Sequence, residues 1–108
     1  MSESPVSDLP EHVDRVLAAV ERIPAGRVMS YGAVAEVVCE GGGRATARSV
    51  GTVMARYGGM VRWYRVVNSV GRLPPGHEQR ARELLAAEGT PFLGDRVDMR
   101  RAAWYPDI

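Results

Sequence analysis

The sequence predicts a mainly α-helical fold of the helix-turn-helix type, winged-helix-like and with short extended segments. Apolar residues recur at helical spacing in several stretches, and a glycine-rich break of about five residues separates the second stretch from the third, which is the layout of a helix-turn-helix. A generic helical hairpin has the same periodicity, so the pattern alone leaves both interpretations open. The length of 108 residues predicts a single domain over 1–108, with residues 1–8 flexible.

Four helices follow from the apolar spacing, and polar residues mark where they begin. The predicted helices span about 9–22, 30–39, 46–57 and 78–88. Ser30 and Thr46 are N-cap candidates for the second and third helices, because a hydroxyl can accept a hydrogen bond from a free N–H group of the first turn. Asp8 and Glu11 have the spacing of a capping box at the start of the first helix.

The remaining segments lack helical spacing. Val61–Val67 is apolar and aromatic and predicts a short extended segment, while Asn68–Gly71 is turn-like and Leu73–Gly76 excludes regular structure. In the tail from Thr90 to Ile108, aromatic residues are separated by polar ones. We therefore expect a small extended element there that packs back on the body through its aromatic side chains.

The composition excludes several classes of protein. With 45% hydrophobic and 25% charged residues, the chain is expected to fold around a core. No apolar run reaches the roughly 18–20 residues of a membrane span, and the polar N-terminus does not resemble a signal peptide, so we expect a cytoplasmic protein with no membrane partner. Cys39 is the single cysteine, and His12 and His77 are isolated, which predicts no disulfide, no metal site and no cofactor.

Charge is unevenly distributed along the chain. The net charge is +1, from 14 basic residues, all of them arginine, and 13 acidic residues. The segment from Gly41 to His77 contains six arginines and no acidic residue. An arginine-rich genome would explain the absence of lysine but not the absence of acids from this segment. Because guanidinium groups bind phosphates bidentately and stack on flat rings, the segment predicts a face for a polyanion.

Individual residues near the predicted helix-turn-helix could contact DNA. Tyr31 would lie at the first position of the second helix, where free N–H groups attract phosphate, although a surface tyrosine covering the helix start is an equal alternative. Arg48 is about 200° from Val50 on a helix of 100° per residue, so it should point away from the core together with Arg44. Gly51 marks either a close approach by another backbone or by DNA, or a tolerated defect.

The run from Val61 to Val67 carries two adjacent aromatic residues, Trp63 and Tyr64, between Arg62 and Arg65. Such a run offers stacking surfaces and cation–π partners, as a base taken out of a duplex requires. The alternative is a pair of core aromatics flanked by arginines whose aliphatic stems cover them.

Three motifs in a consistent order give the chain a family resemblance. Ile23–Ala35 resembles the helix-turn-helix entry of O6-alkylguanine-DNA alkyltransferases, and Ala47–Gly51 resembles their recognition helix. Trp63–Val67 lies where that family carries its active-site signature, Pro-Cys-His-Arg-Val. The resemblance covers about residues 10–89.

Departures from the signature imply that alkyl transfer is lost. The position of the alkyl-accepting cysteine is Trp63, that of its activating histidine is Tyr64, and that of the preceding proline is Arg62. Transfer needs a thiolate and a base to generate it, so the resemblance implies a non-enzymatic protein. Tryptophan at this position is typical of the alkyltransferase-like proteins, which bind O6-alkylguanine without repairing it and hand the lesion to nucleotide excision repair. By the same alignment Cys39 should be a small buried filler.

The resemblance also implies roles for single residues. Tyr31 would rotate the target phosphate, and Arg48 would enter the base stack as a finger while its helix lies in the minor groove. The residues predicted to bind DNA are Tyr31, Arg44, Thr46, Ala47, Arg48, Ser49 and Gly51. The residues predicted to form the alkylguanine pocket are Trp63, Tyr64, Arg65, Val66, Val67 and Arg72, where Arg65 could instead brace the signature. The lesion loop of the family is replaced by Arg72–His77, in which Arg72 or His77 could compensate for a missing serine.

The expected partners are duplex DNA containing O6-alkylguanine and nucleotide excision repair proteins, bound by a monomer. Three alternatives stay open. The chain could be an architectural or transcriptional helix-turn-helix protein without lesion preference, with a steep salt dependence. It could be an enzyme that uses Cys39 for alkyl transfer, or an interaction module whose Arg62–Arg65 run binds a peptide.

Overall fold

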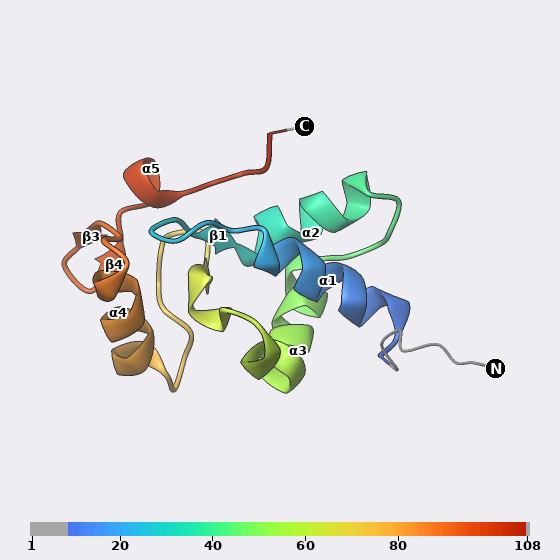
Figure 1. Cartoon of the computed structure of the whole chain (residues 1–108), viewed down its shortest axis with the longest axis horizontal. Helices are drawn as coiled ribbons and strands as arrows, with labels where there is room; N and C mark the ends of the chain where they lie inside the picture. The colour runs from blue at the N-terminus through green and yellow to red at the C-terminus, as the bar shows by residue number, and fades with distance from the viewer. Residues whose placement is uncertain (1–8, 108) are drawn as a thin grey trace.

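The computed structural model describes residues 9–107, which form two helical lobes side by side (Figure 1). The element order is α1 (Glu11–Glu21), β1 (Met29–Ser30), α2 (Tyr31–Glu40), α3 (Ala47–Tyr57), η1 (Gly58–Met60), η2 (Trp63–Arg65), β2 (Val66–Val67), α4 (Glu78–Ala87), β3 (Phe92–Leu93), β4 (Arg96–Val97) and α5 (Met99–Ala102). The helices η1 and η2 are single 3₁₀ turns. This mainly helical architecture, with a helix-turn-helix formed by α2 and α3, confirms the predicted fold class.

The predicted caps begin α2 and α3. The Oγ atom of Ser30 accepts a hydrogen bond from the N–H of Ala33, 3.1 Å away. Thr46 and Ser49 form a reciprocal capping box, in which each side chain accepts from the other residue's N–H. α1 begins after Pro10, and the expected capping role of Asp8 lies outside the described residues. None of the described helices is long and apolar enough to cross a bilayer.

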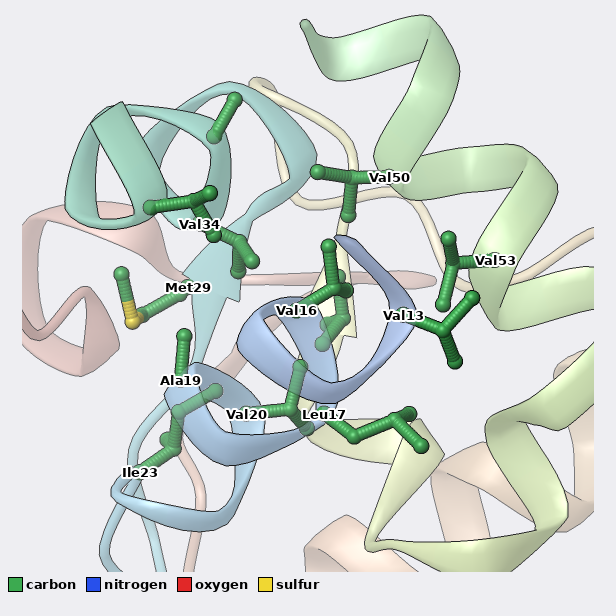
Figure 2. Close-up of a cluster of buried hydrophobic side chains, with 13 residues drawn as sticks. Val13, Val16, Leu17, Ala19, Val20, Ile23, Met29, Val34, Val50 and Val53 are labelled. Carbon is green, nitrogen blue, oxygen red and sulfur yellow. The ribbon is translucent and has the colours of Figure 1, made fainter. Parts of the chain in front are cut away.

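The first lobe is built around α1, which lies against α2 and α3 (Figure 2). Apolar residues three or four apart on α1, Val13, Val16 and Val20, face Val34 of α2 and Val50 of α3 in one buried cluster. Burial of a valine or leucine side chain contributes about 1.5–3 kcal/mol, so this seam fixes the angle at which α3 is presented to solvent. The second lobe is built around α4 and the β3–β4 hairpin, with Leu73, Ala81, Leu85 and Val97 buried between them.

A short parallel sheet joins the two lobes. β1 pairs with β2, so that Met29 lies beside Val66 and Ser30 beside Val67. Successive side chains on a strand point to opposite faces. Met29 and Val66 accordingly enter the core of the first lobe, whereas Val28 and Val67 enter that of the second. All four side chains are at most 1% exposed, so both lobes pack against β2 and against the segment formed by Val28 and β1.

The prediction of an extended segment over Val61–Val67 is wrong for all but its last two residues. Trp63–Arg65 forms a 3₁₀ turn, and only Val66–Val67 is a strand. In an extended chain Trp63 and Arg65 would share one face. A 3₁₀ turn rotates each residue by about 120°, so the three side chains point in three directions. Arg65 thereby reaches the interior while Trp63 stays at the surface.

The tail contains a hairpin, as expected, and also a short helix, α5, that the sequence analysis missed. β3 and β4 are antiparallel, with Phe92 opposite Val97. The side chain of Trp104 packs against the first lobe, and the backbone N–H of Trp104 donates to the carbonyl of Val28 at 2.8 Å. Tyr105 remains 38% exposed, so only part of the aromatic packing predicted for the tail is present.

The expectation that Cys39 is buried is also wrong. Cys39 is exposed in the last turn of α2, where the chain leaves the body toward an exposed glycine loop. Its thiol lies 3.4 Å from the carbonyl oxygen of Ala45.

Candidate nucleic-acid interface

The N-terminal half of α3 and the loop before it form an exposed surface. Val50 is fully buried, and Arg48 points to solvent on the opposite side of the helix, as predicted. Arg44, Thr46 and Ala47 are also exposed, and Ser49 is half-buried. The hydroxyls of Thr46 and Ser49 form the hydrogen bonds of the capping box, so the structural role of both residues is to stabilise the N-terminus of α3. The DNA contacts predicted for these residues stay predictions.

Tyr31 lies at the first position of α2, as expected, and is half-buried. Burial raises the pKa of its hydroxyl above the ordinary tyrosine value, so the group is neutral at physiological pH. A neutral hydroxyl can donate a hydrogen bond to a phosphate oxygen without charge repulsion. Tyr31 also borders two neighbouring cavities, which places it where the two lobes meet.

The larger cavity, of about 700 Å³, opens between α3 and the loop that precedes α4. It is bordered by Tyr31, Gly51, Met54, Ala55, Gly58, Gly59, Trp63, Pro74, Pro75 and His77. The volume lies within the range of about 300–1,000 Å³ that is usual for small-molecule sites. The cavity therefore has room for a nucleobase with a substituent, directly beside the exposed surface of α3.

Glycines make part of this cavity. A Cβ atom built at Gly51 meets no atom within 4 Å, so its missing side chain leaves open space in the wall. Within residues 9–107, no backbone outside α3 lies within 4 Å of a Cβ built at Gly51, so close approach by another segment of the described chain does not explain this glycine. A Cβ at Gly58 would lie 3.3 Å from the Cβ of Trp63, so a small residue lets the tryptophan pack closely under the end of α3.

The 3₁₀ turn η2 sends its three side chains to three different places. Trp63 borders the cavity and meets the rings of Tyr64 and His77 edge-on, with centroids 5.7 Å and 5.6 Å away. Tyr64 turns from the cavity and donates from its hydroxyl to Oε2 of Glu88, 3.1 Å away. Arg65 is 8% exposed and donates from its guanidinium to Glu88 and to the carbonyl of Ile23.

Glu88, at the end of α4, is the centre of this network and was not singled out from the sequence. Burial alone would raise the pKa of its carboxyl, but hydrogen bonds from Arg65, from the N–H of Gly26 and from Tyr64 outweigh burial and hold the pKa below the ordinary value. Hydrogen bonding to Glu88 in turn raises the pKa of Arg65. The sequence did contain one signal for such a partner, which is the position of Arg65 inside an apolar run. A buried guanidinium requires a carboxylate partner.

Several residues predicted to form the alkylguanine pocket do not border the larger cavity, and their contacts with a base stay predictions. Tyr64 and Arg65 point toward Glu88, so Arg65 braces the turn, as the alternative held. The side chains of Val66 and Val67 are at most 1% exposed and lie in the two cores. Arg72 borders the smaller neighbouring cavity of about 570 Å³. Of the residues predicted to form the pocket, only Trp63 borders the larger cavity. Met54, Gly58 and Pro75 also border it and were not predicted from the sequence.

The arginines of the acid-free segment supply an uncompensated positive surface. Five of the six are exposed and form no ion pair within 4 Å with any residue in 9–107: Arg44, Arg48, Arg56, Arg62 and Arg72. Arg65, the sixth, is neutralised internally by Glu88. Within the described residues no three His, Cys, Asp or Glu side chains are grouped as a metal site would require.

Residues 11–90 match the family model of the 6-O-methylguanine DNA methyltransferase, DNA binding domain. The chain belongs to this family. The matched residues include the helix-turn-helix, the cavity and the Glu88 network, whereas the β3–β4 hairpin and α5 lie beyond them.

Two relatives show how close the likeness to known proteins is. The chain is 38% identical over 100 residues to a DNA base-flipping protein of Escherichia coli K12, covering 88% of this chain and 73% of that protein. It is 31% identical over 98 residues to a DNA base-flipping protein of Vibrio parahaemolyticus, covering 85% of this chain and 94% of that protein.

Solved structures within the methyltransferase family extend the comparison. Atl1 of S. pombe, in complex with damaged DNA containing O6-carboxymethylguanine, superposes with a TM-score of 0.75 at 30% identity, over 93% of this chain and all of that one. The O6-methylguanine methyltransferase of Mycobacterium tuberculosis superposes with a TM-score of 0.60 at 30% identity, over 74% of this chain and 49% of that one. The likeness to Atl1 thus covers the described domain almost from end to end.

Proposed function

We propose that this protein binds duplex DNA containing O6-alkylguanine, holds the damaged base outside the duplex in the cavity beside Trp63, and leaves the alkyl group in place. The observation that carries the proposal is the cavity itself, which is large enough for a base and opens next to the exposed, arginine-bearing face of α3. Base-flipping proteins require such a pocket within reach of the groove that their reading helix enters.

Similar proteins support this function. Relatives that share 38% and 31% identity are named DNA base-flipping proteins, and Atl1 has been solved with DNA that contains an O6-substituted guanine. In the proposed complex Arg48 fills the stack that the base has left, and Tyr31 contacts the phosphate of the rotated nucleotide. The exposed arginines of residues 44–72 bind neighbouring phosphates.

The cavity supports binding without alkyl transfer because no thiol borders it. Its lining contains no cysteine. The resemblance of Trp63–Val67 to the family signature puts Trp63 at the position of the acceptor thiol. Cys39 lies in the last turn of α2, outside the lining, with its thiol against the carbonyl of Ala45. The bound lesion would therefore persist and be passed, by a monomeric sensor, to nucleotide excision repair.

The test is fluorescence anisotropy on two short duplexes that differ only in one O6-methylguanine or guanine, at one stated salt concentration. Tighter binding to the O6-methylguanine duplex is expected. Equal affinity for the two duplexes would overturn the proposal in favour of a helix-turn-helix protein that binds DNA without lesion preference. Mass spectrometry of the protein after incubation should show no added methyl group.

Two variants connect affinity to the proposed contacts. Tyr31→Phe should weaken binding to the lesion duplex by about tenfold, the effect of losing roughly one hydrogen bond to a charged group. Arg48→Ala should also weaken binding, because it removes the side chain that fills the base stack. Arg100→Ala, an exposed arginine in α5 of the other lobe, is the matched control and should bind like the parent protein. If all three variants bind alike, the proposed way of holding the base is wrong.

A further inference from the structure

A tight turn fixes the residue that closes the far side of the cavity. The N–H of His77 donates to the carbonyl of Pro74 at 3.1 Å, and Gly76, the third residue of the turn, has a φ of +84°. Proline at the second position and glycine at the third are typical of a type II turn. Pro75 restricts its own φ and Gly76 adopts a conformation that other residues avoid, so the sequence Pro-Pro-Gly holds His77 in a defined place.

His77 begins α4 through its backbone alone. Its carbonyl accepts from the N–H of Ala81 at 3.0 Å, whereas its side chain makes no capping hydrogen bond. The imidazole instead meets the ring of Trp63, with centroids 5.6 Å apart and planes inclined by 64°. His77 is also exposed, so the ring stands at the mouth of the cavity with a polar edge available.

The lining of the cavity leaves His77 as its one group able to carry a positive charge. No aspartate, glutamate or arginine is among the ten lining residues, and the other ionisable side chain, Tyr31, is a neutral hydroxyl. The rest of the lining is apolar side chain and glycine backbone. An anionic group entering this cavity would therefore meet the imidazole of His77 and no carboxylate.

We propose that His77 is a specificity-determining residue that favours O6 substituents ending in a carboxylate over neutral substituents of the same size. This inference rests on the proposed function, in which the substituent of the flipped guanine lies against Trp63. A substituent there is within reach of the imidazole that touches the same ring. An imidazole N–H donates to a carboxylate oxygen, and at the exposed mouth the carboxylate keeps part of its hydration, which limits the cost of burying its charge.

The experiment measures affinity for three duplexes that carry O6-methylguanine, O6-carboxymethylguanine or O6-carbamoylmethylguanine, the last being the neutral isostere of the second. The parent protein should bind the carboxymethyl duplex about tenfold more tightly than the carbamoylmethyl duplex, as expected for one hydrogen bond to a charged group. Because the quantity is a ratio between two lesions, changes in general DNA affinity cancel.

Three variants assign the preference to the imidazole. His77→Leu keeps a side chain of similar bulk and should reduce the ratio to about one, whereas His77→Arg restores a cationic donor and should keep the preference for the carboxylate. Gln79→Leu is the matched control, because Gln79 is an exposed residue in the first turn of α4, outside the cavity lining. Its ratio should equal that of the parent protein.

The outcomes separate this inference from the function on which it rests. If the parent protein does not prefer O6-methylguanine to guanine, the proposed function fails. If that preference is present but the carboxymethyl and carbamoylmethyl duplexes bind equally, or if His77→Leu leaves their ratio unchanged, lesion binding stands and the role of His77 is overturned.

Discussion

The hydroxyl of Tyr64 donates a hydrogen bond to Oε2 of Glu88, the same carboxylate that pairs with Arg65. One carboxylate at the end of α4 thus holds two of the three side chains of η2. It also accepts from the N–H of Gly26, at the turn after α1. Three segments that are distant in the sequence are tied beneath the cavity, and the direction of Trp63 depends on this connection.

Replacing Glu88 should destabilise the fold strongly. Glu88→Gln leaves the guanidinium of Arg65 without a charged partner, and the two side chains are 15% and 10% exposed. Breaking a buried pair from one side costs about 3–5 kcal/mol, so we expect a loss of at least about 3 kcal/mol in the free energy of unfolding, measured with urea at neutral pH. Glu83→Gln removes the exposed pair with Arg80 and should cost less than about 1 kcal/mol. Equal losses in the two variants would contradict the bracing role of Glu88.

The Glu88 network also predicts a dependence of stability on pH. The pKa of Glu88 in the folded protein is lowered, whereas an unfolded glutamate titrates at about 4.3. The stabilisation is therefore complete above about pH 4.3 and is lost as the pH falls through the lower, folded-state pKa. The difference in unfolding free energy between the parent protein and Glu88→Gln should shrink between neutral pH and about pH 3. A difference that stays constant over this range would show that Glu88 does not titrate as described.

Adding a methyl group at Gly51 should separate stability from binding. Gly51→Ala removes a flexible residue from the interior of α3 and meets no atom within 4 Å, so it should stabilise the fold by about 0.5–1 kcal/mol. The same methyl group projects into the cavity, and we expect weaker binding of the O6-methylguanine duplex. Ala87→Ser, at an exposed position of α4 outside the cavity lining, is the control and should leave affinity unchanged. Unchanged affinity in Gly51→Ala would make this glycine a tolerated defect.

A thiol alone should not create an alkyltransferase. In Trp63→Cys the neighbouring Tyr64 still donates its hydroxyl hydrogen bond to Glu88, so it cannot act as the base that the family signature places beside the thiol. We expect no gain of a methyl group when the variant is incubated with an O6-methylguanine duplex and analysed by mass spectrometry. The double variant Trp63→Cys/Tyr64→His supplies a base next to Glu88 and is the one in which transfer is expected. Transfer by the single variant would show that another residue activates the thiol.

Local signals predicted the helices well, because each depends on residues near one another in the chain. Ser30 and Thr46 cap α2 and α3 as expected, and the opposite orientations of Arg48 and Val50 follow from helical geometry alone. The 3₁₀ turn at Trp63–Arg65 was missed because its cause is distant. The turn brings Arg65 to Glu88, which lies 23 residues later in the sequence. The local sequence of Val61–Val67 does not indicate which distant residue pairs with Arg65.

The same distinction applies to the site. Motif resemblance found Tyr31, Gly51 and Trp63, all of which border the cavity. It placed Tyr64, Arg65, Val66 and Val67 in the lining as well, because neighbours in a signature are read together. A turn separates neighbours in space, and the positions left open are taken by Met54 of α3 and by the loop that ends at His77. Only the folded chain brings those segments together.

The sheet formed by β1 and β2 has a consequence for how the molecule melts. Met29 of β1 and Val66 of β2 enter one core, whereas Val67 of β2 and Val28, which directly precedes β1, enter the other. Unfolding of one lobe would expose buried side chains in the core of the other lobe, so the two lobes should unfold in one cooperative transition. A fragment that ends before Val66 would leave the strand of Met29 without its partner. The helix-turn-helix is therefore not a module that can be cut out and moved to another scaffold.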